Sequence, residues 1–233
     1  MKDFIAKFRG KPLDEKQIAI GMHLCYMNAI ALVDDSRLLK ENGRHARAFS
    51  LAILALEELG KIPLILNMIL YRVDDANAWQ EFWRKFNSHQ TKLEVWSTYG
   101  KLFLRVLNRD YETEFPAGVE PLLDKLKQLG FYVNFFSDQF VFPEDFAKDN
   151  SEWIDWLLAV IDERIASFKP LHGSLEDSER LTGRAIELLT VTREAKSPDE
   201  LKRILSEWIS QHSTQNATNI LDSGTVTPNP RTK

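Results

Sequence analysis

The chain has 233 residues, and 30 Lys and Arg against 34 Asp and Glu give a formal net charge of -4. This balance disfavours a protein that coats nucleic acid through charge alone, but it allows a small basic site that grips a few phosphates. The single cysteine, Cys25, excludes an intrachain disulfide framework and a multi-cysteine zinc site. This cysteine usage fits a reducing compartment, so we expect a cytoplasmic protein.

Apolar residues recur at helical spacing along most of the chain. In chain order, the spacing predicts helices over about 14–40, 44–70, 75–89, 93–107, 121–129 and 152–168, followed by helices that begin at the capping signals Ser174 and Ser197. We also expect a kink or break near Pro63, because proline removes one backbone donor and crowds the preceding turn. Aromatic and β-branched residues at 131–136 indicate one short extended segment.

These elements predict an all-α fold, a helical bundle with additional C-terminal helices. No strong change of composition divides the chain, so we expect a single domain over residues 1–212. Its core bundle would cover about 14–145, and its C-terminal helices about 151–212. The tail, residues 213–233, is polar and aperiodic, and we expect it to be disordered.

The most apolar stretch, residues 48–70, is long enough to suggest a membrane span, but it carries Glu57, Glu58 and Lys61 at its centre. Each such charge at a bilayer midplane would cost about 2.5–3.5 kcal/mol, so we interpret the stretch as a buried helix of a soluble protein, with no membrane partner. Lys61 lies three and four positions from the two acids and can pair with either. The alternative is that these charges lie in water at a frayed helix end.

A second polar group follows in Arg84 and His89. On an unbroken helix they would lie about 140° apart, so both reach one phosphate only if the helix bends or ends near Asn87. Arginine can clamp a phosphate oxygen, and histidine can transfer protons near neutral pH. Taken alone, this spacing is equally compatible with a surface arginine and a histidine at a helix end.

In combination, these elements resemble the AbiV family of bacterial abortive-infection proteins, within the HEPN superfamily. The resemblance covers residues from about 15 to 145. The matching elements are Asn28-Ala29 with Asp35, Ala52 through Glu57-Glu58-Leu59-Gly60-Lys61, Arg84 to His89 with Lys92, and Leu129-Gly130-Phe131-Tyr132-Val133. In that last segment Asn134 replaces the acidic residue of the family pattern, and Lys85 follows the arginine where active members often have a small polar residue.

The resemblance implies a HEPN-like helical bundle that dimerises and places an arginine and a histidine in a cleft between two subunits. Arg84 and His89 would be the catalytic pair of an endoribonuclease that needs no metal and no other cofactor. Glu57 or Glu58 would orient them, and Lys61 and Lys92 would contact phosphate. The expected partners are RNA, a second copy of the chain, and a phage-encoded activator or a cognate inhibitor.

Asn28 and Asp35 are seven positions apart and share a helix face. They either line the same cleft as Glu58 and contribute to substrate binding, or they form hydrogen bonds between helices in the core. Both alternatives remain open, because a buried polar group needs a partner in either case.

The main alternative to an enzyme is a non-catalytic helical module that binds a phage protein or a translation factor. Six Trp and 14 Phe supply anchors for such a partner, although we expect Trp153 and Trp156 to lie in the core. A carboxylate-bridged dimetal site is disfavoured, because no histidine has a glutamate three residues before it. The chain also lacks a Gly-x-Ser-x-Gly elbow and a glycine-rich phosphate loop.

Overall fold

The computed structural model describes residues 12–70, 76–89, 91–94, 120–136, 138–148 and 151–193, and then residues 197, 199–200, 202–204 and 206–208. The chain divides into two compact units, residues 1–183 and 184–233, and each is described by itself. The described residues are predominantly helical, which confirms the all-α prediction. Most of the predicted helix over 93–107 and the whole of the predicted disordered tail lie outside the described residues.

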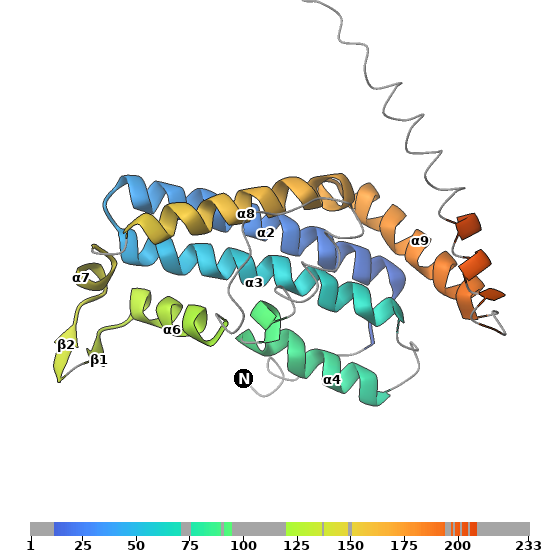
Figure 1. The fold of residues 1–233 in the computed structure, drawn as a ribbon, viewed down its shortest axis with the longest axis horizontal. Coiled ribbons are helices and arrows are strands. Elements are labelled where there is room, and N and C mark those ends of the chain that lie inside the picture. Colours follow the sequence, from blue (N-terminus) through green and yellow to red (C-terminus); the bar gives the residue numbers. More distant parts are fainter. Residues whose placement is uncertain are drawn as a thin grey trace, which may run out of the picture. The chain divides into compact units, whose positions relative to one another are not determined.

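The elements follow one another along the chain as a series of helices interrupted by one hairpin (Figure 1). They are α2 (Glu15–Glu41), α3 (His45–Leu70), α4 (Ala76–Asn87), α6 (Glu120–Phe131), β1 (Asn134–Phe136), β2 (Gln139–Val141), α7 (Pro143–Lys148), α8 (Ser151–His172) and α9 (Leu175–Arg193). The boundary between the two units falls within α9.

Local side-chain signals set both ends of α2. The Asp14 carboxylate accepts a hydrogen bond from the backbone N–H of Gln17 at 2.7 Å, and the Gln17 side chain accepts one from the Asp14 N–H at 3.0 Å. This reciprocal pair satisfies backbone donors that the first helical turn leaves free. At the other end, Asn42 caps the helix and Gly43 adopts a φ of 70°. Glycine is favoured there because it has no Cβ to oppose a left-handed backbone.

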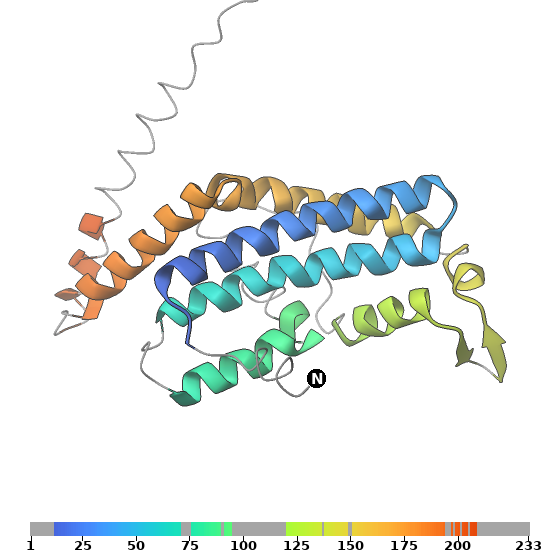
Figure 2. The same ribbon diagram turned by 180° about the vertical axis from the view of Figure 1, so that it is seen from behind.

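Helix α3 is the central element of the first unit. It packs against α2, α4, α6, α7 and α8, and Figures 1 and 2 show α2, α3 and α8 running side by side. Its middle is almost free of exposed surface, with Ala52, Ala55 and Leu56 fully buried. The helix continues through Pro63 to Leu70, so the predicted break of the helix at that proline does not occur. Packing on several sides outweighs the loss of one backbone hydrogen bond.

Helix α4 ends at Asn87, and a second helical segment begins immediately after it. The Ser88 hydroxyl accepts a hydrogen bond from the backbone N–H of Thr91 at 3.2 Å, as an N-cap does. His89 therefore lies in the first turn of the second segment and not on α4. The helix predicted over 75–89 is confirmed as far as Asn87, and its continuation to His89 is wrong because the serine caps a new helix.

Two segments lie unusually close to α3, and each close contact is made possible by a glycine. A Cβ on Gly60 would overlap the carbonyl oxygen of Lys92, and a Cβ on Gly130 would overlap the Ser50 hydroxyl and the Ala46 carbonyl. The Ser50 hydroxyl in turn donates a hydrogen bond to the Lys127 carbonyl at 2.8 Å. The segment with Lys92 and helix α6 can therefore approach α3 more closely than a larger residue would allow.

The predicted extended segment forms β1, which pairs with β2 in a two-stranded antiparallel sheet with Phe135 opposite Phe140. Helix α7 begins directly after this hairpin at Pro143, a residue favoured in the first helical turn. Helix α8 runs on to His172, beyond the predicted end near residue 168. The predicted capping box between Ser174 and Asp177 at the start of α9 is confirmed by their reciprocal hydrogen bonds.

In the second unit, the described residues include a further helix start. The Ser197 hydroxyl accepts a hydrogen bond from the backbone N–H of Glu200 at 3.2 Å, as the sequence predicts. Arg203 forms an ion pair with Glu207 at 2.8 Å, four residues along the chain.

Among the described helices, only α2 is long and apolar enough to span a membrane by length and composition. The same properties are typical of a core helix in a soluble protein, and α2 packs against α3 and α8. The apolar stretch at 48–70 does not meet the criterion. A cytoplasmic location stays a prediction.

Candidate functional site

The side chain of Glu57 is the hub of a buried ionic cluster. It projects from α3 with 2% of its surface exposed. Its Oε2 atom lies 2.5 Å from His89 Nδ1 and 3.4 Å from Lys92 Nζ, while its Oε1 atom lies 2.5 Å from Lys127 Nζ. One carboxylate therefore links α3, the segment after α4, and α6. We call Glu57, His89, Lys92 and Lys127 the Glu57 cluster.

The contact with Glu57 fixes the tautomer of His89. A carboxylate can only accept a hydrogen bond, so the Nδ1 atom 2.5 Å away carries a proton and donates it. The Nε2 atom is then the nitrogen left for other partners, and 55% of the His89 side chain is exposed. This arrangement, a carboxylate orienting an imidazole whose second nitrogen is accessible, is the one used for general acid and base catalysis.

Two buried ammonium groups balance the charge of Glu57. Lys92 and Lys127 both have their side chains almost enclosed. Burial lowers the pKa of Lys92, and the nearby Glu57 carboxylate opposes this effect. Lys127 has a second partner in Asp124, whose Oδ1 atom lies 2.8 Å from its ammonium. A buried carboxylate with these partners avoids the large free-energy cost of an unpaired charge.

The neighbouring acid, Glu58, has different partners. It accepts a hydrogen bond from Lys61 at 2.6 Å, and the Lys61 ammonium lies 5.1 Å from the centre of the Phe86 ring of α4. Cys25 of α2 is buried beside this pair. Burial, with the Glu58 charge, raises the pKa of the Cys25 thiol to about 12. The two adjacent acids of α3 thus belong to separate ion pairs. The raised pKa keeps the Cys25 thiol protonated near neutral pH, so the thiol is not poised for reaction.

Arg84 lies on the exposed side of α4, with 66% of its side chain accessible. Its Nε and Nη2 atoms donate hydrogen bonds to both carboxylate oxygens of Glu81 at 2.7 and 2.6 Å. These hydrogen bonds raise the pKa of Arg84 and lower the pKa of Glu81 to about 2. Lys85 lies 3.4 Å from the same carboxylate. Arg84 is therefore a permanent cation in a planar, two-pronged pairing.

The structure groups some of the predicted site residues and separates others. Glu57, His89 and Lys92 meet in one cluster, and Glu58 meets Lys61. Arg84 is held by Glu81, and its meeting with His89 on one phosphate stays a proposal. Asn28 and Asp35 lie exposed on α2, so they do not bond helix to helix in the core of this chain. Among the described residues, no group of three or more His, Cys, Asp or Glu side chains is arranged to hold a metal ion.

Comparison with known families adds a separate line of evidence. The model of a protein family described as AbiV matches residues 17–152, more than half of the chain. The chain belongs to the AbiV family, within the HEPN superfamily. This is a family of abortive-infection proteins in antiviral defence, and the matched range contains the whole Glu57 cluster. The chain matches no curated protein and no solved structure.

One member of the cluster in this AbiV-family protein was not foreseen from the sequence. Lys127 comes from α6, seventy positions after Glu57. The signal was present in the periodicity, because Leu123, Leu126 and Gly130 are buried on α6 and Lys127 shares their face. A lysine at a buried helical position requires a carboxylate partner, and this requirement points to an acid on the facing helix.

A second feature of this AbiV-family protein is an exposed aromatic surface. Its exposed side chains are those of Phe131, Tyr132, Phe135, Phe140 and Phe142, and we call the range 131–142 that holds them the aromatic hairpin. The rings of Phe135 and Phe140, which are paired across the two strands, contact each other edge to face with their centres 5.2 Å apart, and 78% of Phe140 is exposed. The segment 131–147 contains three acidic residues and no basic ones.

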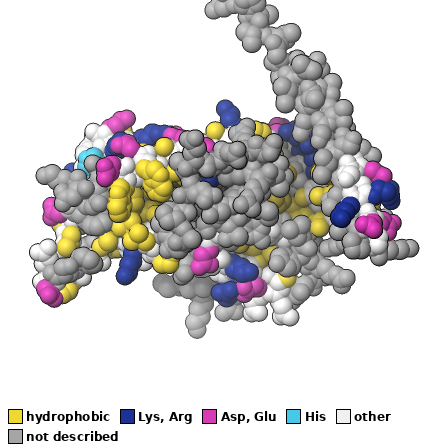
Figure 3. All heavy atoms as spheres, viewed as in Figure 1, with side chains coloured by type: hydrophobic (Ala, Val, Ile, Leu, Met, Phe, Trp, Pro, Cys, Tyr) yellow, Lys and Arg dark blue, Asp and Glu magenta, His cyan; other side chains and the backbone are white. Residues whose placement is uncertain are grey.

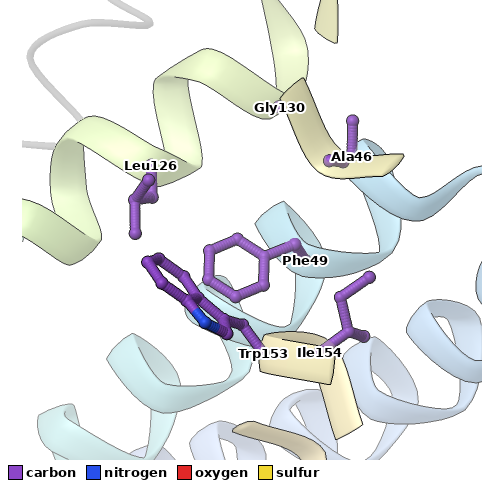
Figure 4. A pocket seen from close by; sticks show the side chains of 7 residues that line it. Ala46, Phe49, Leu126, Gly130, Trp153 and Ile154 are labelled. Carbon is purple, nitrogen blue, oxygen red and sulfur yellow. The ribbon is translucent and has the colours of Figure 1, made fainter. Parts of the chain in front are cut away.

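A shallow apolar hollow lies near the hairpin, where α8 begins. Figure 4 shows the rings of Phe49 and Trp153 side by side, with Leu126 of α6 beside them. Figure 3 shows hydrophobic side chains gathered on this face. Trp153 and Trp156 are 42% and 38% exposed, so the prediction that both lie in the core is wrong. Both residues lie on the outward side of α8 because its inward side is filled by smaller aliphatic residues, among them Ile154 and Leu157.

Proposed function

We propose that this member of the AbiV family is a metal-independent endoribonuclease that acts in antiphage defence by cleaving RNA and so blocking translation. The observation that carries the proposal is the contact between His89 and Glu57, together with the exposure of the His89 side chain. Its Nδ1 atom donates to the buried Glu57 carboxylate at 2.5 Å, while more than half of its side chain stays accessible. A histidine oriented in this way is suited to proton transfer to and from RNA.

The reaction is an internal transesterification. The 2′-oxygen of a ribose attacks the adjacent phosphorus, and His89 Nε2 takes the proton from that oxygen. A new bond forms between the 2′-oxygen and phosphorus, and the bond from phosphorus to the 5′-oxygen of the next nucleotide breaks. The 5′-oxygen leaves with the electron pair of the broken bond and takes a proton from water, and the protonated His89 returns its proton to solvent. The products are therefore a 2′,3′-cyclic phosphate and a 5′-hydroxyl. The reaction proposed here uses no metal ion.

Arg84 stabilises the negative charge that grows on the phosphoryl oxygens. Its guanidinium already makes two parallel hydrogen bonds to the Glu81 carboxylate, and a phosphate offers the same geometry. Because this ion pair is exposed, it contributes little to stability, and an RNA phosphate can replace Glu81 at a small free-energy cost. Lys85, which also faces Glu81, supplies a second positive charge nearby.

The membership of the AbiV family supports proposals about partners as well. We propose that two copies of the chain form the RNA cleft together, and that a phage-encoded activator or a cognate inhibitor controls it. Asn28 and Asp35 lie exposed and so remain open to a partner or a substrate. Light scattering at micromolar concentration tests the dimer. A monomer under these conditions would refute a cleft shared by two copies.

Cleavage of total RNA in the presence of a chelator tests the nuclease proposal. The wild-type protein should cleave RNA, while His89→Ala and Arg84→Ala should each lose at least about 100-fold in rate. Arg180→Ala is a matched control, because Arg180 is also an exposed arginine paired with an acid three positions before it. The control should cleave at the wild-type rate. Wild-type protein that fails to cleave, or variants that cleave equally well, would contradict the proposal.

The aromatic hairpin favours a second candidate function, a non-catalytic module that binds a protein. Exposed aromatic side chains are common anchors in protein interfaces, and the acidic character of segment 131–147 disfavours RNA as the occupant. Phage resistance in cells separates the two functions. Resistance that survives Arg84→Ala but is lost on Phe140→Ser favours the binding module, whereas the reverse result favours the nuclease.

A further inference from the structure

Lys127 is held in a position that an ordinary surface lysine does not occupy. Its side chain is 8% exposed, and its ammonium lies 2.5 Å from Glu57 Oε1 and 2.8 Å from Asp124 Oδ1. A lysine on an amphipathic helix normally extends its charge into water. Here the charge points inward to α3, so the contact with Glu57 is a specific feature of the site.

The two oxygen atoms of Glu57 have separate tasks. Oε1 accepts from Lys127, and Oε2 accepts from His89 at 2.5 Å with Lys92 3.4 Å away. Because the Lys127 ammonium holds Oε1, any partial rotation of the carboxylate away from its present plane would weaken that hydrogen bond. Oε2 is thereby kept facing His89 Nδ1. The orientation of the imidazole thus depends on a residue of α6 that does not touch it.

The docking of α6 on α3 does not require this ammonium. Ser50 of α3 donates to the Lys127 backbone carbonyl, and Gly130 lies directly against Ala46 and Ser50. Leu123 and Leu126 complete the buried face of the helix. These contacts remain when the Lys127 side chain is replaced by one of similar length, so its role in the site can be separated from its role in the fold.

We propose that Lys127 is a positioning residue for His89 and acts through Glu57. The proposal rests on the endoribonuclease function proposed above and extends its site to α6. Lys127 itself makes no contact with RNA, because its ammonium is enclosed and already has two carboxylate partners. Its effect is to hold Glu57 so that His89 Nδ1 keeps its proton and Nε2 stays available to the ribose 2′-hydroxyl.

The test compares Lys127→Met, Lys127→Arg and, as a control on the same helix, the exposed Lys125→Met. Lys127→Met should lower kcat by at least about 10-fold with KM within about twofold, because a misplaced base slows proton transfer without weakening RNA binding. Lys127→Arg should recover most of that loss, because it restores a cation to Glu57. Lys125→Met should behave as wild type. An unchanged kcat in Lys127→Met would overturn the proposal.

Nitrogen-15 NMR of the His89 ring gives a readout that does not need RNA. The wild-type neutral ring should carry its proton on Nδ1, and Lys127→Met should show a mixture of both tautomers. An unchanged Nδ1 signal in Lys127→Met would also overturn the proposal. If Lys127→Met does not fold, Lys127→Gln replaces it, and a wild-type kcat in that variant would count against the role.

The two proposals fail in different ways. If the wild-type protein cleaves RNA, His89→Ala does not, and Lys127→Met matches the wild type, then the role of Lys127 is refuted and the nuclease stands. If the wild-type protein cleaves no RNA, the nuclease is refuted, and the ring spectrum alone decides whether Lys127 orients His89.

Discussion

The backbone of Lys92 crosses α3 at Gly60, so closely that a single added methyl group would overlap the Lys92 carbonyl oxygen. This contact explains in physical terms why a glycine follows the two acids in the Glu-Glu-Leu-Gly-Lys sequence. Glu57 and Gly60 are three residues apart and lie on the same side of α3. One provides the charge that meets His89 and Lys92, and the other provides the space in which their segment can approach.

Gly60→Ala should therefore destabilise the fold, although alanine favours helices. The added Cβ forces the two backbones apart, which should lower the free energy of unfolding by about 1–3 kcal/mol. Chemical denaturation monitored by circular dichroism measures this change. Gly183→Ala is the matched control, because it is also helical but nothing lies within 4 Å of its added Cβ. That variant should gain about 0.4–1 kcal/mol. Equal effects of the two substitutions would contradict the close approach.

Glu57→Gln and Glu58→Gln are nearly isosteric substitutions at neighbouring positions. Of the two, Glu57→Gln should lower the free energy of unfolding more. It leaves Lys92 and Lys127 buried without their shared carboxylate charge, which should cost about 3 kcal/mol of unfolding free energy. Glu58→Gln leaves one partly buried ammonium, that of Lys61, without its carboxylate partner and should cost about 1–2 kcal/mol. Urea denaturation of both variants checks the difference. A similar loss in both would show that Glu57 is not the hub of the cluster.

Cys25 should be unreactive in the native protein. Burial and the Glu58 charge raise the pKa of its thiol from 9.0 to about 12, so its thiolate population at pH 8 falls by about a thousandfold. Alkylation by iodoacetamide, followed by mass spectrometry, should be at least that much slower than in the protein unfolded by denaturant. Rapid labelling of the folded protein would contradict the buried position of this residue.

Stability should fall as the pH is lowered, partly because of His172. This residue is buried, its Nδ1 atom lies 3.0 Å from the Ser178 hydroxyl, and burial lowers its pKa from 6.5 to about 4. Well above pH 6.5 this residue is neutral in both the folded and the unfolded state. Between pH 6.5 and 4 the unfolded chain binds a proton that the folded protein does not, so stability decreases by about 3 kcal/mol over this interval.

The comparison of wild type with His172→Gln isolates this effect from other titrating groups. The variant should be less stable at neutral pH, but its free energy of unfolding should fall less between pH 6.5 and 4 than that of the wild type. The groups facing His172 are the ring of His23, whose Nδ1 donates to the His172 carbonyl, and Asp177 at the start of α9. Parallel pH curves for the two proteins would contradict a neutral, buried His172.

Much of the local structure could be predicted because its causes are local. The capping pairs Asp14–Gln17 and Ser174–Asp177 act across three residues, and both are found as the sequence indicates. The charged residues at 57, 58 and 61 could likewise be predicted to form a buried ionic site, because they lie within an apolar run. The effect of proline on the helices could not be predicted from local sequence. Pro63 and Pro170 both lie inside continuous helices, because tertiary packing outweighs the local penalty.

The choice of partners within the site could not be predicted, because it depends on which helices face each other. The spacing allowed Lys61 to pair with either acid, and the fold assigns it to Glu58. Glu57 instead meets Lys127, seventy positions away. The break at Ser88 has a local cause in its capping hydroxyl, yet its consequence, the turn of His89 toward α3, depends on the close contact at Gly60.

The end groups of cleaved RNA test the central claim most directly. The wild-type protein, incubated with a defined RNA in chelator, should leave 2′,3′-cyclic phosphate and 5′-hydroxyl ends. The same RNA with a 2′-deoxy sugar at the cleavage position should stay intact, and His89→Ala should leave both substrates uncut. Cleavage of the 2′-deoxy substrate, ends carrying 5′-phosphate, or equal cleavage by His89→Ala would contradict the role of His89 and Glu57.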